Sequence, residues 1–142
     1  MSAVRAVIDT NVLHAGLYSA VGASFQVLRL IERQKLTPVL STTLLFEYEE
    51  ILRRHQTLLH LSNRAIEDVL DGLCSRGELQ RVFFLWRPQL ADPKDDHVLE
   101  LAVAAGGVAI VTHNVKHFDA AAAFGIRVVK PAEMLKKLRK PR

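Results

Sequence analysis

Hydrophobic positions along the chain alternate between short continuous runs and stretches with helical spacing. The first run, residues 4–8, is rich in β-branched residues, which is typical of a buried strand, and it stops at Asp9. Strands that alternate with helices predict an α/β domain with a central, mostly parallel sheet and helices on both faces. The expected strands are residues 4–8, 36–40, 79–86, 108–111 and 126–129, and the expected helices are 22–35, 41–55, 62–77, 92–105 and 131–138.

Several helix ends carry recognisable signals. Ser41 and Ser62 stand where N-caps are expected, and Gly77 stands at a helix end. Asp92 and Pro93 form a helix-start signature, with Asp at the N-cap and Pro at the first helical position. We therefore interpret Asp92 as a cap rather than as a ligand.

Composition limits the classes of protein that fit. The chain has 142 residues, 49% of them hydrophobic, which suits one domain over residues 1–142. Its apolar stretches are too short to cross a membrane and the N-terminus lacks the layout of a secretory signal, so no membrane association is expected. Cys74 is the only cysteine, which excludes an internal disulfide and a cysteine metal site and suits the reducing cytoplasm.

The formal charge of +4 is mildly basic and part of it lies in the tail, residues 136–142. Such a tail could contact phosphates or only keep the protein soluble. Aromatic residues make up 6% of the chain, so the sequence reveals no platform on which nucleobases would stack.

Polar residues follow the predicted strands where parallel strands expose their carboxyl ends. Asp9 ends the first strand, and Glu47 lies one to two turns into the helix after residues 36–40. Asp95 and Asp96 fall in the first turn of a later helix, while Thr112 and Asn114 follow the strand 108–111. In a parallel sheet these positions meet at one edge. Two purely structural interpretations stay open: Asp9 could serve as a helix cap and nothing more, and Asp95 could serve to complement a helix dipole and nothing more.

Carboxylates that meet at one edge require protons or a cation, because like charges at close range repel strongly. Oxygen ligands without cysteine or a histidine pair at ligand spacing favour a hard cation, Mg²⁺ or Mn²⁺. Such an ion activates water and stabilises charge on a phosphoryl group. The expected reaction class is metal-dependent hydrolysis of a phosphodiester.

The motifs at these positions resemble those of a known family. Asp9-Thr10-Asn11, Glu47 in the segment 44–48, Asp92-Pro93-Lys94-Asp95-Asp96 and Val111-Thr112-His113-Asn114 look like PIN domains, and most closely the VapC-like toxin ribonucleases of bacterial toxin–antitoxin systems. The resemblance implies a three-layer sandwich and a Mg²⁺- or Mn²⁺-dependent endonuclease for single-stranded or structured RNA. It also implies a homodimer and a small antitoxin protein as partner.

Carried over by position, the family acids fall on Asp9, Glu47 and Asp96, with Asp95 as the rival third acid. The fourth polar position falls on Asn114, and Thr10, Asn11 and Thr112 would support the site. The resemblance thus implies Asp9, Glu47, Asp96 and Asn114 as catalytic residues, and Asp9, Asp96 and Asp95 as the candidate metal ligands.

This chain departs from the family pattern near its fourth acid. Many members have Asp at position 114, or a further Asp where this chain has His117. The site could therefore hold one metal ion firmly and a second weakly, and a non-catalytic or weakly active interaction module stays open as the alternative. A haloacid dehalogenase-type phosphatase also begins with a strand-end Asp, but it needs a second Asp where this chain has Asn11.

Two further expectations concern surfaces. His14, His97, His113 and His117 are secondary candidates for contacts with substrate. The helix 62–75 and the nearby Leu58, Leu59 and Leu61 offer more apolar surface than one small core needs. We expect a dimer interface or an antitoxin groove there.

Overall fold

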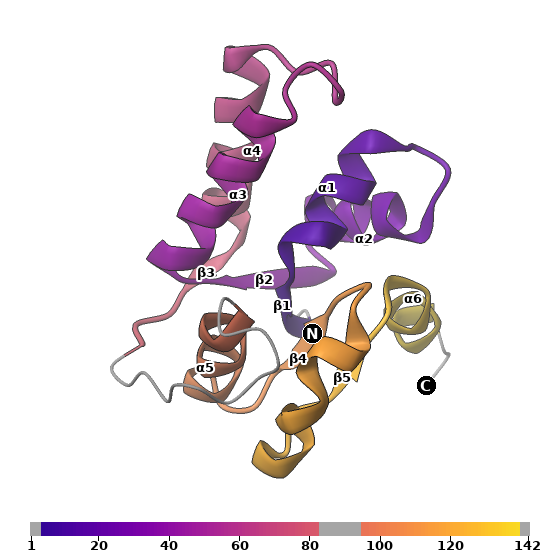
Figure 1. The fold of residues 1–142 in the computed structure, drawn as a ribbon. Helices are drawn as coiled ribbons and strands as arrows, with labels where there is room; N and C mark the ends of the chain where they lie inside the picture. Colours follow the sequence, from indigo (N-terminus) through magenta and orange to yellow (C-terminus); the bar gives the residue numbers. More distant parts are fainter. Residues whose placement is uncertain (1–3, 83–94, 140–142) are drawn as a thin grey trace.

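The computed structural model describes residues 4–82 and 95–139 of the chain. Within this part, five parallel strands form one sheet in the order β3-β2-β1-β4-β5 (Figure 1). β1 is central, and it pairs with β2 through Val4 and Leu36 and with β4 through Val7 and Ile110. The strands are β1 (Val4–Ile8), β2 (Leu36–Leu40), β3 (Glu78–Leu79), β4 (Ala109–Val111) and β5 (Val128–Val129).

Helices cover both faces of this sheet, which confirms the predicted α/β fold. α1 to α4 lie on one face and α5 with the 3₁₀ helix η2 lies on the other, as Figure 1 shows. The C-terminal helix α6 packs against α2. The helices are α1 (Thr10–Tyr18), α2 (Ala23–Glu32), α3 (Thr42–Arg54), α4 (Asn63–Arg76), α5 (Asp96–Ala104), η2 (Val115–Phe124) and α6 (Pro131–Arg139).

Local signals explain most of the boundaries. The hydroxyl oxygen of Ser41 accepts a hydrogen bond from the Leu44 amide at 3.0 Å, and Ser62 does the same for Ala65, so both predicted N-caps are confirmed. Gly77 ends α4 as predicted. A Cβ atom there would lie 2.6 Å from the Leu73 carbonyl oxygen and 2.8 Å from that of Pro38, so the close approach of α4 to β2 requires glycine.

Some elements differ from the sequence prediction. α1 and η2 were not predicted, and the strand expected at 79–86 is limited to Glu78–Leu79 among the described residues, with 83–86 lying outside them. Among the described residues β3 pairs with β2 alone, at the edge of the sheet, and Leu79 is 65% exposed. α5 begins at Asp96 with Asp95 at its N-cap position, and Asp92 and Pro93 lie outside the described residues.

The strand order defines one crevice at the carboxyl edge. From β1 the chain moves outward to β2 and β3, then returns to β4 on the other side of β1. The order therefore reverses between β1 and β4, which is where open α/β sheets bind ligands. Asp9 and Thr112 directly follow these two strands.

No helix in the described ranges has the length and apolar character needed to span a bilayer.

Candidate active site

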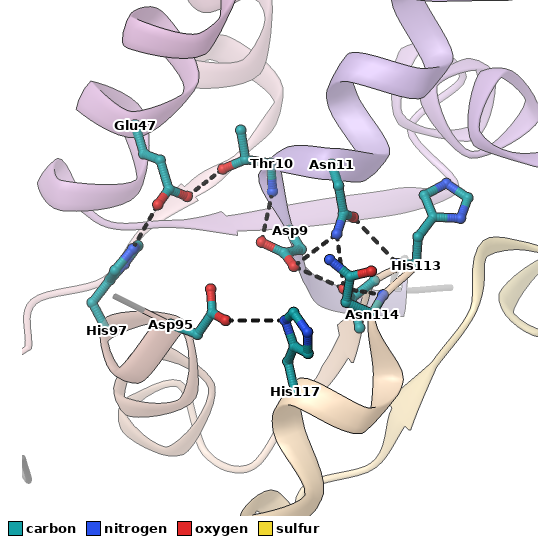
Figure 2. A network of polar contacts seen from close by, with 10 residues as sticks. Asp9, Thr10, Asn11, Glu47, Asp95, His97, His113, Asn114 and His117 are labelled. Carbon is teal, nitrogen blue, oxygen red and sulfur yellow. Dashed lines mark hydrogen bonds and ion pairs between the residues drawn. The ribbon is translucent and has the colours of Figure 1, made fainter. Parts of the chain in front are cut away.

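Asp9 lies at the centre of a polar network at this crevice (Figure 2). Its side chain is only 7% exposed. Its Oδ1 accepts a hydrogen bond from the Thr10 amide at 2.8 Å, and its Oδ2 accepts one from the Thr112 hydroxyl at 2.7 Å and a longer one from Asn11 Nδ2 at 3.3 Å. Asp9 is thus both the N-cap of α1 and a residue of the crevice, so the two interpretations of its role are compatible.

Burial makes the ionised form of the Asp9 carboxyl energetically unfavourable. Desolvation raises its pKa above the ordinary 3.8, and the nearby negative charge of Glu47 adds to this effect. The hydrogen bonds from Thr112 and Thr10 act in the opposite direction but do not cancel it. An adjacent cation would remove this penalty, so the environment of Asp9 favours a bound positive charge.

Glu47 is held by two groups from other elements. The Thr10 hydroxyl donates a hydrogen bond to its Oε2, and Nε2 of His97 lies 3.2 Å from its Oε1. Burial alone would raise the pKa of Glu47, but the hydrogen bonds from His97 and Thr10 outweigh it and lower the pKa. Glu47 is therefore a carboxylate at neutral pH, with both oxygens oriented by α1 and α5.

The crevice opens into a cavity of about 460 Å³. Figure 2 shows the carboxyl groups of Asp9, Glu47 and Asp95 facing the same space. The cavity has an acidic part near the sheet and a second part between α1 and α3. It is lined by Asp9, Thr10, Asn11, His14, Glu47, Glu50, Ile51, Arg54, His55, Asp95, Asn114 and His117.

The structure separates the two candidate acids at the start of α5. Asp95 lines the cavity, and its Oδ2 lies 3.7 Å from Nδ1 of His117. Asp96 is fully buried and is not among the lining residues. The two consecutive acids therefore differ in environment, with Asp95 at the cavity wall and Asp96 in the protein interior. The sequence favours Asp96 as the third acid, but the acid that lines the cavity is Asp95.

The end of β4 is tied to the end of β1 by side-chain hydrogen bonds. Besides donating to Asp9, the Thr112 hydroxyl oxygen accepts from the Asn114 amide at 3.0 Å. Oδ1 of Asn11 accepts from the His113 amide at 3.2 Å. Thr112 and Asn11 therefore hold the crevice together, while Asn114 reaches the cavity itself.

The histidines divide into two groups. His14 and His117 line the cavity and His97 contacts Glu47, whereas the ring of His113 pairs with Ser24, its Nε2 lying 2.6 Å from the serine Oγ. Sequence reasoning missed His55, whose Nδ1 lies 2.8 Å from Nε2 of His14. Its place at the end of a predicted helix carried no signal for this contact.

The donor set of the cavity fits a hard divalent cation. Asp9, Asp95 and the Asn114 amide offer oxygen ligands, and Mg²⁺ commonly binds through one or two carboxylates while keeping several waters. Among residues 4–82 and 95–139, no three His, Cys, Asp or Glu side chains lie close enough to hold a metal ion alone. The site therefore suits an ion that retains waters rather than one enclosed by protein ligands.

A profile of the PIN domain matches residues 5–116, which run from β1 into η2 and include every cavity-lining residue except His117. No curated protein matches the chain.

Proposed function

The chain belongs to the PIN domain family, and we propose that it is a Mg²⁺- or Mn²⁺-dependent endoribonuclease that hydrolyses single-stranded RNA. PIN domains are generally nucleases and typically use divalent metal ions. The observation that supports this function in the present chain is the group of three carboxylates, Asp9, Glu47 and Asp95, lining one cavity at the switch point of the sheet.

In the proposed mechanism, Asp9 and Asp95 would hold the cation, and Asn114 would supply a neutral oxygen. When bound there, a divalent ion would neutralise the carboxylates and stabilise charge on the phosphodiester. Glu47 accepts a hydrogen bond from the attacking water, and Thr10 and His97 fix the direction of its carboxylate. Thr112 and Asn11 keep Asp9 in position through their hydrogen bonds.

Asn114 and His117 stand on one side of the cavity, where neither supplies a carboxylate. With a carboxylate at neither position, that side offers fewer charged ligands for a second ion. We therefore expect one firmly held ion, with a second one recruited together with the RNA phosphate. The proposal thus predicts hydrolysis of RNA with one firmly held ion, whereas a non-catalytic interaction module would hydrolyse no RNA.

The proposal predicts that a labelled single-stranded RNA is cut in Mn²⁺ or Mg²⁺ and stays intact in chelator. The matched substrates are a duplex and a single-stranded DNA of the same sequence, which should be cut more slowly. Titration calorimetry with Mn²⁺ should show a binding site. Cleavage that persists in chelator would contradict the mechanism, and an absence of both Mn²⁺ binding and cleavage would favour the interaction module.

We further propose that the protein is the toxin of a toxin–antitoxin pair and acts as a cytoplasmic homodimer. Support comes from an apolar pocket of about 270 Å³ between α1, α2 and α4, whose walls include Leu17, Leu28 and Val69. Leu58 is 51% exposed, but Leu59 is buried in the core, so only part of the predicted apolar surface is accessible.

A small amphipathic segment of an antitoxin would fit such a pocket. Light scattering should give the mass of a dimer for the protein alone, and a larger mass after a candidate antitoxin is added, namely the product of a small gene found next to the gene of this protein. A monomer whose mass does not change with that product would contradict both assignments.

A further inference from the structure

The part of the cavity between α1 and α3 is built differently from its acidic part. His14 of α1 and His55 at the end of α3 are joined by a hydrogen bond of 2.8 Å, with their rings nearly perpendicular at 88°. Both line the same cavity as Asp9, Glu47 and Asp95. The proposed mechanism gives this histidine pair no role.

The hydrogen bonding of this pair has one consequence whichever tautomer is present. Whichever ring donates the shared hydrogen bond, each ring keeps one outer nitrogen, Nδ1 of His14 and Nε2 of His55, and at least one of these carries a hydrogen. Neither outer nitrogen has another hydrogen-bond partner in the described part of the chain. The pair therefore offers a hydrogen-bond donor to a ligand in the cavity.

An exposed aromatic ring continues this surface along α1. Tyr18 lies one helical turn beyond His14, and the two rings are nearly parallel at 18°, with their centres 6.4 Å apart. Tyr18 is 61% exposed, so its ring is open to solvent. A tyrosine ring open to solvent beside a hydrogen-bond donor is the kind of surface on which single-stranded nucleic acids stack their bases.

Charge also separates the two parts of the cavity. Arg54 lies beside His55 in the sequence and lines the cavity, where it forms an ion pair with Glu50. The two side chains neutralise each other, so this part lacks the excess of negative charge found around Asp9, Glu47 and Asp95. A phosphate that flanks the reacting one therefore meets less repulsion in this part than beside Asp9, Glu47 and Asp95.

We propose that Tyr18, His14 and His55 form a nucleotide subsite next to the reacting phosphodiester. The ring of Tyr18 stacks on a base, and the histidine pair donates a hydrogen bond to the flanking phosphate. This inference rests on the proposed function, since it assumes that RNA enters the cavity. It assigns to these residues a role in binding the substrate, with no part in the chemical step.

The test is the affinity for a short fluorescein-labelled single-stranded RNA, measured by anisotropy in chelator so that no cleavage occurs. Tyr18→Ala should raise the Kd about tenfold, whereas Tyr18→Phe keeps the stacking surface and should bind as the wild type does. The double change His14→Ala and His55→Ala should raise the Kd several-fold. Val21→Ala, a change at a residue 93% exposed just beyond α1, should have no effect.

A second readout separates binding from chemistry. In Mn²⁺, Tyr18→Ala should raise KM for RNA cleavage and leave kcat unchanged, because it removes an interaction made equally in the ground and transition states. Melting temperatures of all variants establish that each is folded. Carboxylate variants play no part in this comparison.

The outcomes distinguish this inference from the proposed function. If the wild type binds RNA with the expected dependence on Tyr18 and the histidines but never cuts it, the subsite stands and the nuclease assignment fails. If the wild type cuts RNA while the variants keep its Kd and KM, the subsite is wrong and the nuclease assignment stands. A wild type that binds no RNA in chelator or in Mn²⁺ overturns the subsite as well.

Discussion

Asp9→Asn is expected to lower the rate of RNA cleavage by about two orders of magnitude or more while the protein stays folded. Asn has nearly the same shape as Asp, so the carbonyl oxygen still accepts from the Thr10 amide and the new amide group can donate to the Thr112 oxygen. The change gives up the longest contact of Asp9, the 3.3 Å hydrogen bond from Asn11. It also removes the charge that would hold the cation.

The same variant should be more stable than the wild type in chelator at neutral pH. The pKa of Asp9 is raised in the folded state by burial, so the folded protein binds a proton more tightly than the unfolded chain. Stability therefore falls as the pH rises from below 3.8 through the raised folded value. Asn carries no such proton, so its advantage should be present at neutral pH and absent at acid pH.

Thermal melting with and without Mn²⁺ checks this prediction alongside the cleavage assay. Mn²⁺ should raise the melting temperature of the wild type and have little effect on Asp9→Asn, because a ligand stabilises only the form that binds it. Two results would show that Asp9 does not hold the cation. One is a cleavage rate of Asp9→Asn equal to that of the wild type, and the other is an equal rise in melting temperature with Mn²⁺ in both proteins.

Exchanging each of the two acids at the start of α5 for Asn should have opposite consequences. Asp95→Asn should lower cleavage by about two orders of magnitude with little change in stability, because Asp95 lines the cavity and Asn is as favourable as Asp at a helix N-cap position. Asp96→Asn should cost about 1–3 kcal/mol of stability and leave the activity of the folded protein largely intact, because Asp96 is fully buried away from the cavity lining.

These two variants are matched in chemistry and differ by a single position, so each is the control for the other. Denaturant unfolding gives the stability of each, and cleavage rates are normalised to the folded fraction. The reverse pattern, with inactive but stable Asp96→Asn and active Asp95→Asn, would assign the ligand to Asp96, as the sequence motif suggested.

The elements of the fold were largely predictable because their causes are local. The apolar run of β1 and the carboxylate after it are adjacent in the chain, and the N-caps Ser41 and Ser62 bond amides three residues away. α1 escaped prediction because Asp9, Thr10 and Asn11 read equally well as a turn. The 3₁₀ helix η2 lacks the regular apolar spacing of an α-helix, so the pattern did not reveal it.

The sequence was also sufficient to bring Asp9, Glu47 and the pair Asp95–Asp96 to one edge, because every strand of a parallel sheet ends there. Which acid of the pair faces the cavity depends on the rotation of α5 about its axis, and the packing of that helix on the sheet determines it. The contact between Glu47 and His97, and that between His14 and His55, join residues about 40 to 50 positions apart. Such contacts depend on how helices meet across the fold, and no local pattern in the chain encodes them.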